Sequence, residues 1–381
     1  MKYTARIISR YTCDTSGVCS ALYELGGMTV MHDPGGYGSI YATHDEPRWY
    51  DSESLIFVSG LTETQAILGD DTKLVQDTLQ AARRVQPKFI SLTGSPIPAV
   101  VGTDFEALAF EIENELGIPT FGFDTDGMHT YVAGVSKALA MVAQRLCQPG
   151  QSKLAGVVNI LGVTPLDFSI NGSAEALTQV LSDRGLTVQA NWAMTSSLVQ
   201  LEAAGAASAN LVVTAGGLKA AQILQDRFGT PYVLGTPYGP NLTDTIVTAL
   251  NLAATTGENQ SVINVPQDTG TIIIGESLTA LSLATAIFRA TGRGATIICP
   301  TESETEILAY GCLTIRDEDD IESYLHHADT IIADPMYQPI CPPNAKFVPL
   351  PHEAFSGRIY HSTMPNLVTE LPEFLAAQNL D

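Results

Sequence analysis

The sequence predicts an α/β protein of three Rossmann-like domains, each a mostly parallel β-sheet flanked by helices. Short apolar runs alternate repeatedly with amphipathic helical stretches, which is the pattern of α/β units with parallel strands. The chain has 381 residues, of which 45% are hydrophobic and 16% charged, so it is globular and too long for one ordinary core. We expect domains at 1–150, 151–264 and 265–381, with the segment after about residue 350 returning to the first domain.

The first domain opens on the apolar run 28–31, which predicts a strand leading into a glycine-rich turn. Beyond the turn, β-branched and aromatic runs indicate strands, and apolar residues at helical spacing indicate helices. Strands are expected at 54–60, 88–92 and 118–123, and helices at 75–84 and 103–116. Thr103 or Asp104 can cap the second helix, and Gly117 ends it. The segment 62–74 carries another possible strand.

A polar linker at 148–153 marks the first expected boundary. Two further units follow, and each begins strand–loop–helix with small residues in the loop. Strands are expected at 154–162, 186–190, 209–214, 232–234, 269–277, 295–300 and 327–335. Helices are expected at 174–184, in the segment that ends at residue 228, and at 278–290. Ligands bind beyond the carboxyl ends of parallel strands. We therefore expect the loops after the strands at 154–162, 269–277 and 327–335 to meet the turn at 32–38. The cleft that they form should contain Asp167, Glu276 and Tyr337.

Charge and motif content exclude several classes of partner. A net charge of −22 and a pI near 4.5 argue against nucleic acid or an anionic membrane, because both need a positive face. No apolar run is long enough to cross a bilayer, and the N-terminal segment lacks an apolar core of signal-peptide length. The chain has no G-x-G-x-x-G or P-loop motif, so no nucleotide is expected. Its six cysteines form no C-x-x-C pair, which disfavours a disulfide framework or a zinc knuckle and favours the cytoplasm.

The segment 13–38 gathers most of the candidate chemistry. Cys13 is followed four residues later by Gly17, and the turn His-Asp-Pro-Gly-Gly-Tyr-Gly at 32–38 closes the segment. Proline fixes one backbone angle there, and the glycines permit conformations that other residues avoid. The turn can therefore approach another surface closely. The polar atoms around it belong to Cys13, His32, Asp33 and Tyr37.

Four stretches carry a family resemblance. They are Cys13-Asp-Thr-Ser-Gly17, the turn at 32–38, Thr62-Glu63 through Gly69 to Lys73-Leu74, and Thr93-Gly-Ser-Pro through Gly102-Thr-Asp104. Each resembles a motif of the nitrogenase component 1 family, which includes nitrogenase subunits, their cofactor-assembly scaffolds and the dark-operative chlorophyll-biosynthesis reductases. Later segments resemble the second and third domains of that family, at 209–212, 227–232, 329–334 and 351–358. The resemblance covers nearly the whole chain, although no motif is intact.

The resemblance implies a cofactor position that this chain fills only in part. In the family, three cysteines per subunit hold an iron–sulfur cluster at a subunit interface. Cys13 stands in the first position, Tyr37 occupies the second, and Ser95 falls at or near the third. Iron–sulfur clusters require soft thiolate ligands, so the chain cannot hold a full four-iron cluster as a monomer. Asp33 and Cys19 are further candidate metal ligands beside Cys13.

The resemblance also implies two groups of site residues. The cofactor-binding group comprises Cys13, Gly17, His32, Tyr37 and Ser95. In nitrogenase, a cysteine of the middle domain and a histidine near the C-terminus hold the large cofactor. The corresponding region at 215–217 has no cysteine, whereas His352 lies near the place of the histidine, with His361 as a rival. Our candidate catalytic residues are His352 and Asp33, and the cavity is left for an organic substrate or another metallocofactor.

Two functions follow from the resemblance. In the first, the chain is a subunit of a nitrogenase-like oxidoreductase complex that takes electrons from an ATP-dependent iron–sulfur reductase and reduces an unidentified substrate. In the second, it is a redox-inactive scaffold or metallocofactor-binding protein of the same fold. Both imply a homodimer, or a heteromer with a cysteine-complete homologue. The cluster would be shared across the subunit interface and handled under anaerobic conditions.

Overall fold

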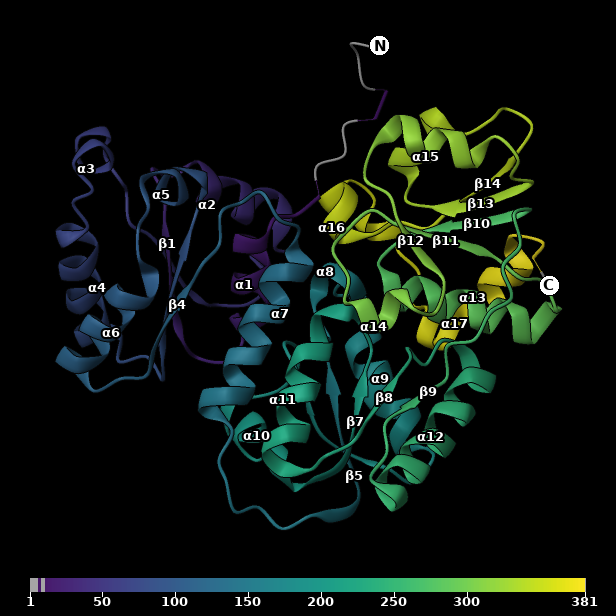
Figure 1. Cartoon of the computed structure of the whole chain (residues 1–381), viewed down its shortest axis with the longest axis horizontal. Helices are drawn as coiled ribbons and strands as arrows, with labels where there is room; N and C mark the ends of the chain where they lie inside the picture. Colours follow the sequence, from purple (N-terminus) through teal and green to yellow (C-terminus); the bar gives the residue numbers. More distant parts are fainter. Residues whose placement is uncertain (1–5, 8–10, 381) are drawn as a thin grey trace.

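The computed structural model describes residues 6–7 and 11–380 and contains three parallel β-sheets, each flanked by helices (Figure 1). The first sheet has the order β2-β1-β3-β4, and all its neighbouring strands are parallel. Its strands are β1 (Met28–His32), β2 (Leu55–Val58), β3 (Ile90–Gly94) and β4 (Thr120–Phe123). Every residue of β1 and β3 is buried, as expected for strands covered on both faces. The predicted fold class is confirmed.

The helices of this part are α1 (Asp14–Leu22), α2 (Gly36–Ile40), α3 (Glu63–Leu68), α4 (Thr72–Val85), α5 (Pro96–Val101), α6 (Phe105–Leu116) and α7 (Tyr131–Met141). Asp104 caps α6 and Gly117 ends it in a left-handed conformation, as predicted. The possible strand at 62–74 is wrong, because this segment forms α3 and the start of α4. Thr62 and Gln65 form a capping box, which satisfies two backbone N–H groups and starts α3.

The second sheet has the order β6-β5-β7-β8-β9. Its strands are β5 (Leu154–Leu161), β6 (Thr187–Asn191), β7 (Ala207–Val212), β8 (Tyr232–Leu234) and β9 (Gln260–Ser261). The helices that follow in this part are α8 (Pro165–Phe168), α9 (Ser173–Ser182), α10 (Leu198–Glu202), α11 (Leu218–Phe228) and α12 (Gly239–Thr256).

The third sheet has the order β12-β11-β10-β13-β14. Its strands are β10 (Thr271–Ile274), β11 (Thr296–Cys299), β12 (Cys312–Thr314), β13 (Thr330–Ala333) and β14 (Lys346–Pro349). The remaining helices are α13 (Ser277–Thr291), α14 (Thr305–Leu308), α15 (Glu318–Leu325), α16 (Glu353–Ser356) and α17 (Leu367–Ala377). The first sheet ends before residue 150, the second lies between residues 150 and 265, and the third begins after residue 265. The domain boundaries near these two residues stay predictions.

Helix α7 joins the first sheet to the other two. One apolar core lies between the first sheet and helices α4 and α6. A larger core begins at α1 and α7 and continues through the second and third sheets. The C-terminal segment also reaches the first domain, where Thr12 N–H donates to the Ala354 carbonyl at 2.8 Å and Arg358 donates to the carbonyls of Ala42 and Glu46. In the part of the chain that the structure describes, no helix has both the length and the apolar character to cross a membrane.

Candidate functional site

Cys13 lies immediately before α1, in the wall of a cavity of about 250 Å³ that we call the Cys13 cavity. Tyr37, Asp45, His129 and Thr130 also line this cavity. The Cys13 Sγ is 3.7 Å from the Ser16 hydroxyl. Burial raises the pKa of the Cys13 thiol to about 11, and the nearby Asp45 carboxylate adds to the effect. The thiol is therefore protonated at neutral pH.

Asp33 closes the turn that follows β1. Its Oδ2 accepts hydrogen bonds from the backbone N–H groups of Gly35 at 2.6 Å and Tyr37 at 3.0 Å. Gly35 has a φ of 134°, a conformation that favours glycine. The Asp33 carboxylate is thus already bonded within its own turn, and the turn presents Tyr37 to the Cys13 cavity. The Tyr37 hydroxyl donates to the Gly127 carbonyl at 3.4 Å.

His32 and Ser95 face away from this cavity. The His32 ring bonds through Nδ1 to the Ser59 hydroxyl at 2.8 Å, and its Nε2 is 3.3 Å from Asp71 Oδ1. Burial lowers the pKa of His32, although the Asp71 carboxylate acts in the opposite direction. Ser95 is buried at the start of α5, and its hydroxyl donates to the His32 carbonyl at 3.4 Å. Neither is among the described residues that line the Cys13 cavity.

Cys19 lies on α1 inside a small apolar cluster with Tyr23, Met31 and Tyr41. It is fully buried, and this burial raises the pKa of its thiol well above the ordinary value. Gly17, on the same helix, lies against α7, where an added Cβ would be 2.2 Å from the Tyr131 carbonyl oxygen. Gly17 therefore serves the close packing of α1 and α7.

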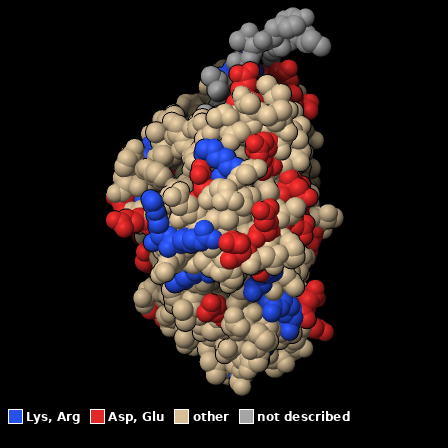
Figure 2. Space-filling model, turned by 90° about the vertical axis from the view of Figure 1, so that its left-hand side faces the viewer, with Lys and Arg blue, Asp and Glu red and all other residues tan. Residues whose placement is uncertain are grey.

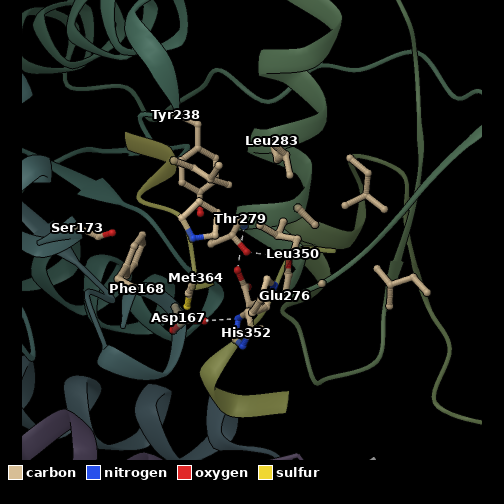
Figure 3. A pocket seen from close by; sticks show the side chains of 17 residues that line it. Asp167, Phe168, Ser173, Tyr238, Glu276, Thr279, Leu283, Leu350, His352 and Met364 are labelled. Atoms are coloured by element: carbon tan, nitrogen blue, oxygen red, sulfur yellow. Dashed lines mark hydrogen bonds and ion pairs between the residues drawn. The ribbon is translucent and has the colours of Figure 1, made fainter. Parts of the chain in front are cut away.

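A second cavity, which we call the central cavity, lies between the second and third sheets and the C-terminal segment (Figure 3). It has a volume of about 50 Å³. Four ionisable side chains line it: Asp167 on α8, Tyr238 before α12, Glu276 before α13 and His352 before α16. The rest of the wall is mainly aliphatic, as in most small-molecule sites; it includes Ile273, Ile274, Leu283, Leu350 and Leu367.

Asp167 is the centre of a buried hydrogen-bond network. Its Oδ1 accepts from the Tyr131 hydroxyl, and its Oδ2 accepts from the Thr164 hydroxyl at 2.7 Å. The His352 Nε2 lies 3.5 Å from Asp167 Oδ1 (Figure 3). His352 Nδ1 accepts from the backbone N–H of Ala354 at 3.3 Å, so the neutral ring carries its proton on Nε2, on the side of Asp167.

Glu276 is fully buried and caps α13. Its Oε1 accepts from the N–H groups of Ala215 at 3.0 Å and Leu278 at 3.1 Å, and its Oε2 accepts from Thr279 N–H at 2.9 Å. These donors and the positive end of the helix stabilise the charge. Burial nevertheless raises the pKa of Glu276, and the charge of Asp167 raises it further. The central cavity therefore holds a carboxyl group with a raised pKa beside the hydrogen-bond network of Asp167.

The structure separates the groups that the sequence analysis expected in one cleft. Asp167 and Glu276 share the central cavity, but Tyr337 does not line it, and its hydroxyl bonds to that of Tyr11. The turn at 32–38 contributes Tyr37 to the Cys13 cavity instead. The prediction of a single cleft is wrong because the first turn of α7 stands between the two cavities. Thr130 lines one cavity, and the next residue bonds to Asp167 in the other.

Comparison with known proteins assigns the family. The family model described as "Nitrogenase component 1 type Oxidoreductase" matches residues 13–273. The chain belongs to this family. Among solved structures, "Nitrogenase Cp1 at pH 6.5" superposes with a TM-score of 0.71 at 16% identity, covering 100% of this chain and 94% of that one. At this identity the match shows the shared fold.

Curated relatives of this nitrogenase component 1 type chain include proteins with two different names. The "Nitrogenase iron-molybdenum cofactor biosynthesis protein NifE" of Clostridium pasteurianum is 27% identical over 273 residues, which is 66% of this chain and 58% of the relative. A light-independent protochlorophyllide reductase subunit of Leptolyngbya boryana is 36% identical over 110 residues, which is 29% of this chain and 20% of the relative. The chain thus spans little more than half of the first relative and a fifth of the second.

The residues at the family's cluster positions do not fit a cluster held by this chain alone. Of the described residues considered for this role, Cys13 supplies the one thiol in the Cys13 cavity. Tyr37 lies beside it with a hydroxyl, Ser95 is turned toward the backbone of β1, and Cys19 is enclosed by apolar side chains. Asp33 Oδ2 is committed to the turn. Hard oxygen groups and one protonated thiol are a poor ligand set for iron–sulfur chemistry.

In the central cavity, the structure distinguishes the two candidate histidines. His352 lines the cavity, whereas His361 pairs through Nδ1 with Glu353 and lies 3.2 Å from the Ser169 hydroxyl. Ala215, in the region that lacks the family's cysteine, donates its N–H to Glu276. No local sequence pattern indicates a role for Tyr131, because its partner Asp167 is 36 residues away and meets it only in the fold.

Proposed function

We propose that this chain is a subunit of a nitrogenase-like oxidoreductase complex that reduces a small substrate in the central cavity. The carrying observation is the buried network of Tyr131, Asp167 and His352 beside the carboxyl group of Glu276. Reduction consumes protons as well as electrons, and a closed cavity needs internal groups that hold and deliver them. Glu276, whose raised pKa favours the uptake of a proton, relays protons to the substrate, and His352 lies beside Asp167.

The alternative of a metallocofactor scaffold is less well supported. The central cavity has about 50 Å³ of space, which is enough for a few atoms but not for a large cluster. The corresponding region at 215–217 offers backbone N–H groups rather than a thiol. We therefore favour a small substrate over a large metallocofactor.

We propose that the electron donor, an ATP-dependent iron–sulfur reductase, docks on α3 and α5. These helices lie at the upper left in Figure 1, on the side of the molecule that faces the viewer in Figure 2, where charged side chains of both signs are interspersed with uncharged surface. They expose a group of large apolar side chains, as interaction sites do: Ile67, Leu68, Ile97, Val100 and Val101. Both helices are tied to the turn after β1, because Leu61 N–H donates to the Asp33 carbonyl and the Ser95 hydroxyl to that of His32.

The electron path requires a second subunit in this proposal. Cys13 is one ligand of a cluster shared across a subunit interface, and the partner supplies the others, either as a cysteine-complete homologue or as a second copy. A relative named as a subunit of a reductase supports the heteromer. We place the complex in the cytoplasm.

An anaerobic electron-transfer assay tests this function. The chain is co-expressed with a cysteine-complete homologue and a P-loop iron–sulfur ATPase from the same genome, and MgATP-dependent oxidation of the reduced reductase is followed by its paramagnetic resonance signal. We expect oxidation that Leu68→Glu slows by tenfold or more, by the loss of about 1.4 kcal/mol of docking energy. Val199→Glu, at an equally exposed valine on α10, should leave the rate unchanged. No oxidation by an assembled complex would overturn the proposal in favour of the scaffold.

A further inference from the structure

The wall of the central cavity contains two carboxyl groups and a single nitrogen base among its described residues. Asp167 and Glu276 are both buried. Of the described residues that line the cavity, none is lysine or arginine, and His352 is the one nitrogen base among them. A ligand with negative charge would lose its hydration here and face two carboxyl groups, which is costly in a medium of low dielectric constant.

The positive end of α13 cannot compensate such a ligand, because Glu276 already occupies it. The N–H groups of Ala215, Leu278 and Thr279 all donate to the Glu276 carboxylate at 2.9–3.1 Å. An anion would have to displace this internal carboxylate to reach the same donors. The chain thus fills with its own side chain the position where an anionic group would otherwise bind.

The remaining wall selects for a short apolar body. The aliphatic part of the wall includes Ile273, Ile274, Leu283, Leu350 and Leu367. A volume of about 50 Å³ accommodates a few non-hydrogen atoms.

We propose that the central cavity binds a small organic cation with N–H groups, of the alkylammonium type. Its charged head lies against the carboxyl groups of Asp167 and Glu276, and its short aliphatic body lies against the wall around Leu283. Charge-assisted N–H···O bonds supply the selectivity over uncharged ligands of the same shape. The inference rests on the proposed function only in that it names the substrate class of the same cavity.

Binding is tested with three probes of similar size: propylammonium, 1-propanol and propionate, at matched millimolar concentration and ionic strength and at neutral pH. The protein is the complex with its natural partner, without reductase or ATP. We expect propylammonium to raise the unfolding temperature and to bind with one-to-one stoichiometry by calorimetry. We expect 1-propanol to bind at least about tenfold more weakly than propylammonium, as the loss of charge-assisted hydrogen bonds implies. We expect propionate not to bind.

Variants locate the binding. Glu276→Gln should weaken propylammonium binding by about tenfold or more, whereas Glu175→Gln, an exposed glutamate on α9, should not. Because a glutamine amide would point N–H groups at the donors of α13, this variant can fail to fold. Ala280→Leu therefore provides a second test, since it keeps both carboxyl groups and fills the cavity, and it should abolish binding.

Propionate binding as tight as that of propylammonium, or propylammonium binding that survives in Ala280→Leu, would overturn the inference. The electron-transfer assay gives a separate answer on the proposed function. ATP-dependent oxidation of the reductase without ammonium binding would refute only the ligand class. Ammonium binding without ATP-dependent oxidation would refute only the reductase role.

Discussion

The Cys13 cavity and the central cavity lie on the two sides of the first turn of α7. They differ in whether hydrogen bonds hold the surrounding elements or join the side chains that line the cavity. Around Cys13 a hydrogen-bonded frame joins three elements: Thr15 of α1 donates to the Gly94 carbonyl, Asp33 closes the turn after β1, and the Ser95 hydroxyl donates to the His32 carbonyl. The side chains at the cluster positions, however, are mostly oxygen groups. In the central cavity the side chains themselves form a buried, hydrogen-bonded ionisable network.

The difference shows that the frame and the chemistry of a site depend on different atoms of the chain. Backbone positions that pack one helix on another, such as Gly17, accept no side chain without moving a neighbour. A position at the edge of a cavity, such as Tyr37, accepts a new side chain because only its own main-chain N–H takes part in the turn, where it donates to the Asp33 carboxylate.

The largest effect should come from disrupting the frame that both cavities share. In Gly17→Val the new Cβ would lie 2.2 Å from the Tyr131 carbonyl oxygen, which is main chain and cannot yield without shifting α7. We expect a loss of about 3 kcal/mol or more in the free energy of unfolding, measured with denaturant. Gly36→Ala is the control, because nothing lies within 4 Å of its added Cβ. Equal stability of the two variants would show that the cavities do not depend on this contact.

The second test compares two buried carboxyl groups, Glu46 near the Cys13 cavity and Glu276 in the central cavity. Arg48 Nε donates to Glu46 at 2.7 Å, and Arg48 also bonds to the Ala193 carbonyl in the second domain. Burial alone would raise the pKa of Glu46, but pairing with Arg48 holds it below the ordinary value. Removing one partner of such a pair costs about 3 kcal/mol. We expect Glu46→Gln to lose that much at neutral pH by denaturant unfolding.

The pH dependence of the two carboxyl groups should have opposite signs. Glu46 contributes stability above the ordinary carboxyl pKa of 4.5, and this contribution disappears as the pH falls through its lower folded-state pKa. The deficit of Glu46→Gln should therefore shrink below pH 4.5. At neutral pH, ionised Glu276 lowers the free energy of unfolding of the wild type, and this loss disappears as the pH falls toward 4.5 and Glu276 takes up a proton. The deficit of Glu276→Gln should therefore grow in that range. Parallel changes in the two variants would contradict the assigned environments.

Tyr131→Phe tests the network of the central cavity by itself. It removes the hydroxyl that donates to Asp167 and leaves the packing of α7 unchanged. We expect a cost of about 1–2 kcal/mol, the range for a hydrogen bond to a buried charged group. Tyr324→Phe, at an exposed tyrosine on α15, is the control for the general effect of losing a hydroxyl. If both variants unfold at the same denaturant concentration as the wild type, the network does not contribute to stability.

Cys13→Ala should have the smallest effect on stability and a specific effect on composition. The thiol is half-buried and contacts the Ser16 hydroxyl at 3.7 Å, so we expect a change below about 1 kcal/mol. The anaerobic complex should lose iron and acid-labile sulfide relative to the wild type. Cys341→Ala, at another half-buried cysteine, should retain both. Iron content that is the same in the two variants would remove Cys13 from the ligand set.

Local patterns account for most of the fold. The strand expected at 118–123 is β4 (Thr120–Phe123), and the helix expected from Thr103 or Asp104 is α6, with Asp104 as its cap. The segment at 62–74 differs from the expected strand because its short apolar run at 66–68 fits either structure. There the capping box of Thr62 and Gln65 favours a helix.

Residue patterns alone predict an α/β protein with three mostly parallel sheets, and the resemblance of four motifs indicates the family. The assignment of Tyr37 and Ser95 to two cluster positions stays a prediction. Periodicity, caps and residue types are properties of short segments, so they can be read without knowing the fold. Only the folded chain shows that His352 rather than His361 lines the central cavity and that Asp33 closes a turn. Folding also brings together Asp167, on the helix after β5 of the second sheet, and Glu276, in the loop after β10 of the third sheet. Burial, partner identity and pKa depend on neighbours supplied by distant segments, and these neighbours meet only when the chain folds.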